Sequence, residues 1–435
     1  MTMPTSGICG GTLMFMKALC PAEIVPKRAR DYSGTARAKQ APDRSADVRA
    51  PCFTPPAPLT IAEAKYFWSK KARICGTSRP LICWKKLVER GDEMLRLQRQ
   101  RLESMGDAAA ALQTAIDLEF STIPAYLYTK FSIKPGSNRQ AVDSLSSIVG
   151  QEMTHMCLAC NILNAIGGTP KLSSPVYPGP LPGGIGRDGA PLIAHLLPFS
   201  PEAMKQGMDI EEPEEPIPFP VERLMMAEAA LTVTIGEFYA ALDAFLAQLP
   251  NTQWAPNRNQ IDDAQFFAGQ LFPINSYADA HRAISIIVSE GEGTKANPLD
   301  FENEVSHYYR FGEVFYDKVL TKADNRLGYT WGPAPLGVDW SAVYPAISDP
   351  GTHDFSNEPP TARAVQAACN QAYTTLIEEL QRAVSGERAR LGNAVRAMFD
   401  LRMASTTALS TPLSQSDKVA GPAFIYTPSS TGAVQ

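Results

Sequence analysis

Residues 146–168 read SSIVGQEMTHMCLACNILNAIGG, an apolar helical pattern with a Glu and a His in its middle. Glu152 and His155 are three residues apart, so on a helix both point to the apolar side. A carboxylate buried in a core costs free energy unless it is paired, neutralised or bound to a metal. The fold must therefore supply this helix with buried partners for charged groups.

Three further segments show a helical period of apolar residues with acidic groups or His on the same stripe. They are residues 107–131 with Glu119, residues 221–248 with Glu237, and residues 300–320 with Glu304 and His307. Two helices with a lone Glu and two with a Glu-x-x-His pair supply the ligands of ferritin-like di-iron or di-manganese bundles. Carboxylate and imidazole ligands suit both metals and leave positions open for dioxygen or substrate. We predict two bound iron ions, with manganese as the alternative.

The sequence does not decide which carboxylate accompanies His307 in the ligand set. Glu304 has the required spacing to His307, whereas Glu292 lies in a Gly-Glu-Gly turn that ends the preceding helical segment. Either residue can complete the ligand set. We predict that Glu290 is solvated. The other histidines are predicted to be structural or surface residues: His195, His281 and His353.

The patterns as a whole predict an all-α fold: a four-helix bundle with a long irregular crossover and extra C-terminal helices. The crossover, residues 167–220, contains twelve prolines, and loops of this length are often lids or binding walls. No β-sheet pattern is found. The predicted parts are a disordered or mis-called N-terminal extension (1–58), a helical lead-in (59–105), the metal-binding bundle (106–325), a loop with accessory helices (326–404) and a loosely ordered tail (405–435).

Composition narrows the classes of partner. The formal net charge is −5, although residues 1–50 hold eight Lys and Arg against four Asp and Glu. An acidic body argues against nucleic acid as a partner, and no apolar run reaches the ~20 residues of a membrane span. We expect a cytoplasmic protein, with organellar targeting by the basic N-terminus as the alternative.

The eight cysteines are predicted to be reduced thiols, because a chain this long does not need a disulfide framework. Cys157 and Cys160 lie one helical turn apart without a second pair. Core packing therefore explains these two thiols better than a zinc site does.

Five segments together resemble the ferritin-like domain of iminophenyl-pyruvate dimer synthases, enzymes of bisindole pigment pathways. They are AIDLEFSTIPAYLYTKFSI, VGQEMTHMCLACNILNAIGGTP, TIGEFYAAL, IIVSEGEG and SHYYRFGEV, within residues 106–322. The resemblance implies a metal-dependent oxidative enzyme of secondary metabolism that acts on an imine made from an aromatic amino acid. By position it implies five metal ligands, with Glu292 as a further candidate: Glu119, Glu152, His155, Glu237 and His307.

Our leading hypothesis is a non-haem oxidoreductase that uses dioxygen or peroxide on a small organic substrate. The crossover and the aromatic side chains of residues 307–311 would form the walls of its pocket. Three tyrosines would either donate protons or electrons or only pack: Tyr126, Tyr128 and Tyr308. The alternative is a non-catalytic scaffold or metal-binding protein that packs against a biosynthetic partner or a second copy of itself. Iron storage is a third hypothesis. It requires a bundle that assembles into a cage, and the long loops would obstruct that assembly.

Overall fold

The computed structural model describes residues 94–186, 189–213, 232–262, 267, 269–291, 298–300, 303–325, 328–414 and 416–428. These residues are mainly helical, which confirms the predicted all-α class. The α-helices are α4 (Met105–Phe131), α5 (Arg139–Ala165), α6 (Pro201–Ile210), α7 (Ile235–Leu246), α8 (Tyr277–Gly291), α9 (His307–Tyr316), α10 (Pro360–Val384) and α11 (Leu391–Ala408). The strands are β1 (Arg96–Gln98), β2 (Gly179–Ile185), β3 (Pro191–Ala194), β4 (Thr232–Val233), β5 (Leu320–Lys322) and β6 (Tyr329–Trp331). None of the described helices has the length and hydropathy of a membrane span.

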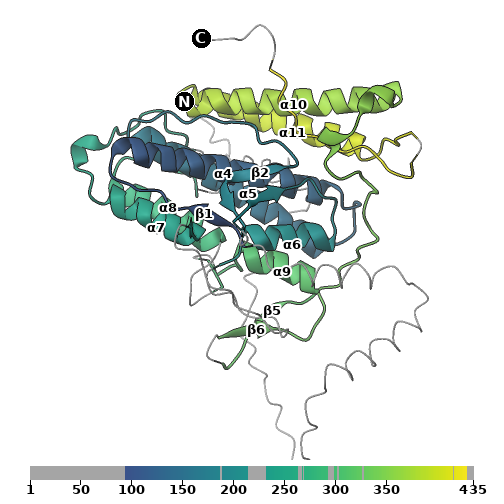
Figure 1. The fold of residues 1–435 in the computed structure, drawn as a ribbon, viewed down its shortest axis with the longest axis horizontal. Helices are drawn as coiled ribbons and strands as arrows, with labels where there is room; N and C mark the ends of the chain where they lie inside the picture. Colours follow the sequence, from purple (N-terminus) through teal and green to yellow (C-terminus); the bar gives the residue numbers. More distant parts are fainter. Residues whose placement is uncertain are drawn as a thin grey trace, which may run out of the picture. The chain divides into compact units, whose positions relative to one another are not determined.

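The two long helices α4 and α5 agree with the prediction. α4 begins at a capping box, in which the Ser104 side chain accepts from the backbone N–H of Asp107 and the Asp107 carboxylate accepts from the backbone of Ser104. The helix continues through Pro124. α5 ends before Gly167, whose φ of +90° suits a glycine. The two helices pack along each other (Figure 1).

The remaining half of the bundle consists of short helices. α7 packs on α8 along one part of the α4–α5 pair, and α6 packs on α9 along another part, while α5 touches both α8 and α9 (Figure 1). The continuous helices predicted at 221–248 and 300–320 are therefore wrong in their described portions. α7 begins only at Ile235, after β4, and α9 begins only at His307, after a bridge between Leu299 and Val305. The breaks place helix ends, rather than helix middles, in the core.

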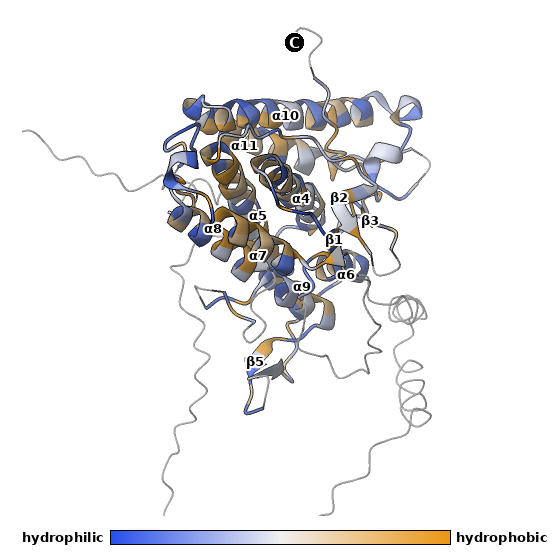
Figure 2. Ribbon diagram, turned by 60° about the vertical axis from the view of Figure 1, so that its left-hand side comes forward, coloured by the Kyte–Doolittle hydropathy of each residue, from blue (hydrophilic) through white to orange (hydrophobic). Residues whose placement is uncertain are grey.

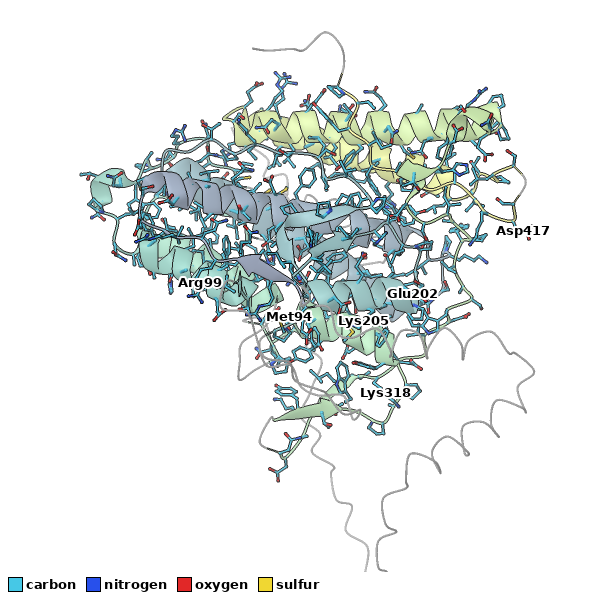
Figure 3. The ribbon with its side chains drawn as sticks, viewed as in Figure 1. Met94, Arg99, Glu202, Lys205, Lys318 and Asp417 are labelled. Atoms are coloured by element: carbon cyan, nitrogen blue, oxygen red, sulfur yellow. The ribbon has the colours of Figure 1, made fainter. Side chains whose placement is uncertain are left out.

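The proline-rich crossover contains regular structure that the prediction lacked. α6 begins with Ser200 as its N-cap and Pro201 in its first turn, where proline's missing N–H costs nothing. Its buried side carries Met204 and Met208. Lys205, labelled in Figure 3, pairs with Asp209 one turn further along. A high proline content therefore did not exclude a helix.

A small antiparallel sheet with strand order β3-β2-β1-β4 packs against α4, so the prediction of no β-sheet is wrong. Leu97 of β1 pairs with Gly184 of β2 and Val233 of β4. β1 also lies in the predicted helical lead-in, most of which is outside the described residues. β1, β3 and β4 have four residues or fewer, and β2 contains three glycines and two prolines among its seven residues, a composition typical of loops.

The C-terminal helices α10 and α11 form a hairpin, and they divide near Gly386 as predicted. Figure 2 shows α10 hydrophilic on its outer side and hydrophobic toward α11. Gln381 of α10 docks the hairpin on the chain after α5, since it bonds the backbone of Pro170 and Leu172. The tail predicted to be loose packs closely in its described part, where Ala420 and Phe424 are buried.

Candidate metal centre

Four of the predicted site residues meet in the core. Glu119 comes from α4, Glu152 and His155 from α5, and His307 from the first turn of α9. Their exposed fractions are 7%, 2%, 1% and 0%. Two further buried carboxylates join them: Glu211, which caps the C-terminus of α6, and Glu290, in the last turn of α8. We call these six residues the Glu/His cluster.

One half of the cluster consists of Glu119, Glu152 and His155, whose ligand atoms lie within 4.8 Å of one another. His155 Nδ1 lies 3.5 Å from Glu119 Oε2 and 4.0 Å from Glu152 Oε1. Two ligands that each bind one ion at about 2.1 Å lie about 3–4 Å apart. These separations therefore suit one metal ion.

The other half consists of Glu152, Glu211 and His307, again within 4.8 Å of one another. His307 Nδ1 lies 2.8 Å from Glu152 Oε1 and 3.7 Å from Glu211 Oε2. The rings of His155 and His307 are stacked, with centroids 5.7 Å apart. Because Glu152 belongs to both halves, the cluster offers two neighbouring metal positions that share one carboxylate.

Hydroxyl groups fix the shared carboxylate and the two unshared ones. The hydrogen bonds run from Tyr239 to Glu119 Oε1 (2.7 Å), from Thr122 to Glu152 Oε2 (2.6 Å) and from Tyr126 to Glu211 Oε1 (2.7 Å). In each case the second carboxylate oxygen is the one that faces an imidazole Nδ1. Each carboxylate thus has one oxygen held by the protein and one directed at a metal position.

Both imidazoles are also held from behind. His155 Nε2 lies 2.9 Å from Glu290 Oε2, and His307 Nε2 lies 3.1 Å from Gln151 Oε1. A metal-binding His usually donates its second ring N–H to such a partner, which fixes the tautomer and the ring orientation. Both Nδ1 atoms are left to face the cluster. Glu290 therefore acts as a partner of His155 on the side away from the metal positions.

The electrostatics of the cluster show an excess of negative charge. Burial and the charge of Glu211 raise the pKa of Glu152 to about 7. Burial alone would lower the pKa of His155, but Glu119 and Glu290 raise it well above its usual value. The pKa of His307 is raised by Glu152 and Glu211 in the same way, against the effect of burial. Cations at the two positions would compensate these carboxylates.

The surroundings of one buried nitrogen atom indicate whether a metal ion fits the cluster. His307 Nδ1 makes no acceptable hydrogen bond to any described residue, although Glu152 Oε1 is only 2.8 Å away. Two lone pairs at this distance repel each other unless a proton or a cation lies between them. Carboxylate oxygens with imidazole nitrogens are the donor set of iron and manganese sites. The residues present therefore fit a pair of such ions.

Glu237 lies outside the cluster, contrary to the prediction. It is exposed and occupies the third position of α7, where its carboxylate accepts from the backbone N–H of Thr234 at 3.0 Å. The Thr234 hydroxyl accepts from the N–H of Glu237 in return. This capping box is readable in the sequence as Thr-x-x-Glu. The prediction placed Glu237 in the middle of a helix, whereas α7 begins only at Ile235, after β4.

Glu304 also lies outside the cluster. It precedes α9, so it does not share a helical face with His307, and its one-third-exposed side chain pairs with Arg310 at 3.3 Å. The alternative ligand, Glu292, lies outside the described residues. The prediction that Glu290 is solvated is wrong, because this carboxylate is 3% exposed and bonded to His155.

Sequence signals existed for the residues that the prediction missed. Glu290 continues the apolar stripe of α8 one turn after Ile287. Glu211 continues the stripe of Met204 and Met208 on α6, behind an N-cap followed by proline. Tyr239, by contrast, reaches Glu119 across the bundle, and no local pattern indicates that contact.

The other candidate residues lie elsewhere, as predicted. The three remaining histidines pair with carboxylates outside the cluster: His195 with Asp349, His281 with Asp243, and His353 with Glu358. The described cysteines are buried and free, and burial raises the pKa of the Cys157 thiol to about 12. The Tyr128 hydroxyl donates to the carbonyl of Ile347.

A cavity of about 20 Å³ adjoins Glu119, Glu152, His155 and Glu211, enough for one water-sized ligand. Its other walls come mainly from aliphatic side chains: Leu118, Ile210, Ile235, Ile287 and Val288. The prediction gave these walls to the crossover 167–220 and to the aromatic side chains of residues 307–311. Among the described residues, the crossover contributes Ile210, and the other aliphatic side chains take the place of the aromatic ones.

Comparison with known proteins gives one family match and one similar solved structure. Residues 112–316, from α4 to the end of α9, match the model of a family described as Ferritin-like. A solved structure of a ferritin-like protein from Caulobacter vibrioides shares 23% sequence identity, covers 75% of this chain and 99% of its own, and superposes with a TM-score of 0.49. No curated protein matches the chain.

Proposed function

Because residues 112–316 match the model of the Ferritin-like family, we propose that the Glu/His cluster holds two iron ions and that the protein is an oxygen- or peroxide-dependent oxidoreductase. Manganese is the alternative metal. The sharing of Glu152 between two sets of ligand atoms carries this proposal. The second imidazole and the third carboxylate give a second ion ligands of its own.

When bound, a pair of such ions supplies the electrons that reduce dioxygen or peroxide. The side chains of the protein have other tasks. Burial and neighbouring carboxylates raise the pKa of Tyr126 and Tyr239 well above the usual value, so both phenols stay neutral and hold their protons. Each phenol thereby keeps one carboxylate oxygen oriented. The aliphatic walls of the cavity exclude bulk water from the ligand atoms.

The substrate class that we propose is a small organic molecule, such as an imine derived from an amino acid, in secondary metabolism. The resemblance of five segments to iminophenyl-pyruvate dimer synthases supports this choice. Among the described residues, Ile210, Ile235 and Ile287 line the cavity beside the ligand atoms. Variants at these three positions are therefore the first to examine for altered substrate preference.

The size of the cavity supports a second candidate function. A space of about 20 Å³ holds a water-sized ligand but no organic molecule. A metal-binding scaffold without catalytic activity, which packs against a biosynthetic partner, needs no larger space. This candidate predicts metal uptake without any consumption of oxygen.

The test is to load metal-free protein with Fe²⁺ without oxygen, determine the bound iron, and then measure oxygen uptake after air is admitted. We expect about two irons per chain and rapid oxygen consumption. The double variant Glu152→Ala/His155→Ala should lose both while it keeps its helical circular dichroism. Glu237→Ala, which alters a Glu of the helix cap, should keep both.

The outcomes separate the candidates. Two irons with oxygen uptake support the oxidoreductase and justify a search for its substrate. Two irons that do not react with oxygen or peroxide favour the scaffold. Folded wild-type protein that takes up neither iron nor manganese would refute the metal centre itself.

A further inference from the structure

The two metal positions have matching ligands. Each consists of one unshared carboxylate, the shared Glu152 and one imidazole Nδ1. Each unshared carboxylate accepts one tyrosine hydrogen bond of 2.7 Å. Among the described residues, the groups that lie behind these ligands distinguish the two positions in charge.

The groups behind the two imidazoles differ in charge. His155 Nε2 contacts the carboxylate of Glu290 at 2.9 Å, and the other oxygen of Glu290 accepts from the amide of Gln270 at 3.2 Å. His307 Nε2 contacts the neutral amide oxygen of Gln151 at 3.1 Å. One imidazole thus has an anionic acceptor, and the other has a neutral one.

Arg310 increases this difference. Its Nη1 donates to the same Gln151 oxygen at 3.0 Å. Because a guanidinium only donates, the oxygen assignment of Gln151 is fixed, and His307 Nε2 must be a second donor to it. Gln151 therefore lies between the imidazole of His307 and a cationic group.

The two carboxylates near Arg310 lie at one end of its guanidinium. The side chain is 5% exposed and also donates to the carbonyl of Val305. Its nearest carboxylates are Glu304, at 3.3 Å and one-third exposed, and Asp300, at 3.7 Å. Both lie at Nη2, whereas Nη1 faces Gln151.

We infer that the two metal positions are unequal: the one formed by Glu119, Glu152 and His155 binds its ion more tightly and fills first, and the one formed by Glu152, Glu211 and His307 binds the second ion more weakly. This inference rests on the proposed dimetal centre. A carboxylate behind an imidazole increases the basicity of the ligand nitrogen. A cation that polarises the amide acceptor has the opposite effect on His307.

The test compares single positions, so that repulsion between two bound ions does not enter. Glu211→Gln leaves the His155 position, and Glu119→Gln leaves the His307 position. Metal-free forms of both are titrated with Mn²⁺ by calorimetry and by the EPR signal of the free ion. We expect Glu211→Gln to bind one Mn²⁺ at least ~10-fold more tightly than Glu119→Gln.

Two further variants test the cause. Glu290→Gln, added to Glu211→Gln, should weaken binding by about 10–100-fold. Gln151→Glu, added to Glu119→Gln, should strengthen binding and narrow the difference. Asp349→Asn is the matched control, because Asp349 contacts His195 at 2.7 Å outside the cluster. It should leave both affinities unchanged, and circular dichroism checks the folding of every variant.

Equal affinities of the two single-position variants, or tighter binding by Glu119→Gln, would overturn the inference and leave the dimetal centre intact. The inference is also overturned if Glu290→Gln does not change the Mn²⁺ affinity of the His155 position. If the folded wild-type protein binds no Mn²⁺ or Fe²⁺ at all, both the inference and the proposed function fail.

Discussion

At the scale of single residues, Tyr126 and Tyr128 allow a matched test of how the protein orients its ligands. Both are buried tyrosines of α4 whose hydroxyls donate hydrogen bonds, Tyr126 to Glu211 and Tyr128 to the carbonyl of Ile347. We predict that Tyr126→Phe weakens metal binding at the His307 position by about 10-fold, because it frees one oxygen of Glu211. Tyr128→Phe should cost stability only. Calorimetric titration with Mn²⁺ and thermal melts separate the two effects, and equal affinities in both variants would contradict the prediction.

Residues with a local pattern were the predictable part of the site. Glu152 and His155 stand three apart on the buried stripe of a long helix, so their common direction followed from helix geometry. Glu119 was found in the same way. Glu211 and Glu290 were missed because each stands at a helix end, where proline or glycine in the sequence indicates a loop. The contact of Tyr239 with Glu119 joins residues 120 positions apart and had no local signal.

At the scale of elements, Glu237 allows a test of whether this residue caps a helix or binds a metal ion. Its carboxylate accepts from the Thr234 N–H at the start of α7. We predict that Glu237→Ala keeps the full metal content and loses about 0.5–1 kcal/mol of unfolding free energy. Glu211→Ala should instead lose about one of the two ions. Metal analysis and urea unfolding measure both quantities, and a loss of metal from Glu237→Ala would restore the original assignment.

The close approach of α6 and α9 gives a second test at this scale. A Cβ at Gly207 would lie 2.7 Å from the Phe311 ring, whereas one at Gly150 on α5 would meet nothing within 4 Å. We predict that Gly207→Ala destabilises the fold by about 1–3 kcal/mol and weakens the His307 position, because Glu211 caps α6. Gly150→Ala should stabilise by about 0.5–1 kcal/mol. If thermal unfolding shifts both variants in the same direction, the packing argument fails.

The division of the bundle into short helices explains which elements could be predicted. α4, α5, α10 and α11 have long apolar stripes and clear ends, and all four were expected. The other half of the bundle breaks near the metal positions, so that Glu211, Glu290 and His307 enter from helix ends. Helical periodicity favours continuous helices and cannot locate such breaks. The capping signals at Ser200 and Thr234 could locate them.

At the scale of the whole molecule, the charge of the cluster links stability to pH and metal. The pKa of Glu152 rises from 4.5 to about 7 on folding, so the native state binds more protons than the unfolded state between these values. Metal-free protein should therefore lose stability as pH rises from 4.5 to about 7, by up to about 1.4 kcal/mol per pH unit from this group. The raised pKa values of His155 and His307 extend the loss to higher pH.

Bound metal should reverse this dependence. Ligands must release protons to bind an ion, so metal affinity rises with pH, and the bound ion stabilises the native state. We predict that chelated protein becomes less stable from pH 5 to pH 8 in urea unfolding, while Mn²⁺-loaded protein becomes more stable. Metal-free Glu152→Gln should lack the part of the loss that Glu152 causes, because glutamine does not titrate. The prediction is contradicted if the stability of the chelated protein stays constant or rises over this range. The buried carboxylates would then not oppose folding, and the electrostatic argument for a metal at this site would fail.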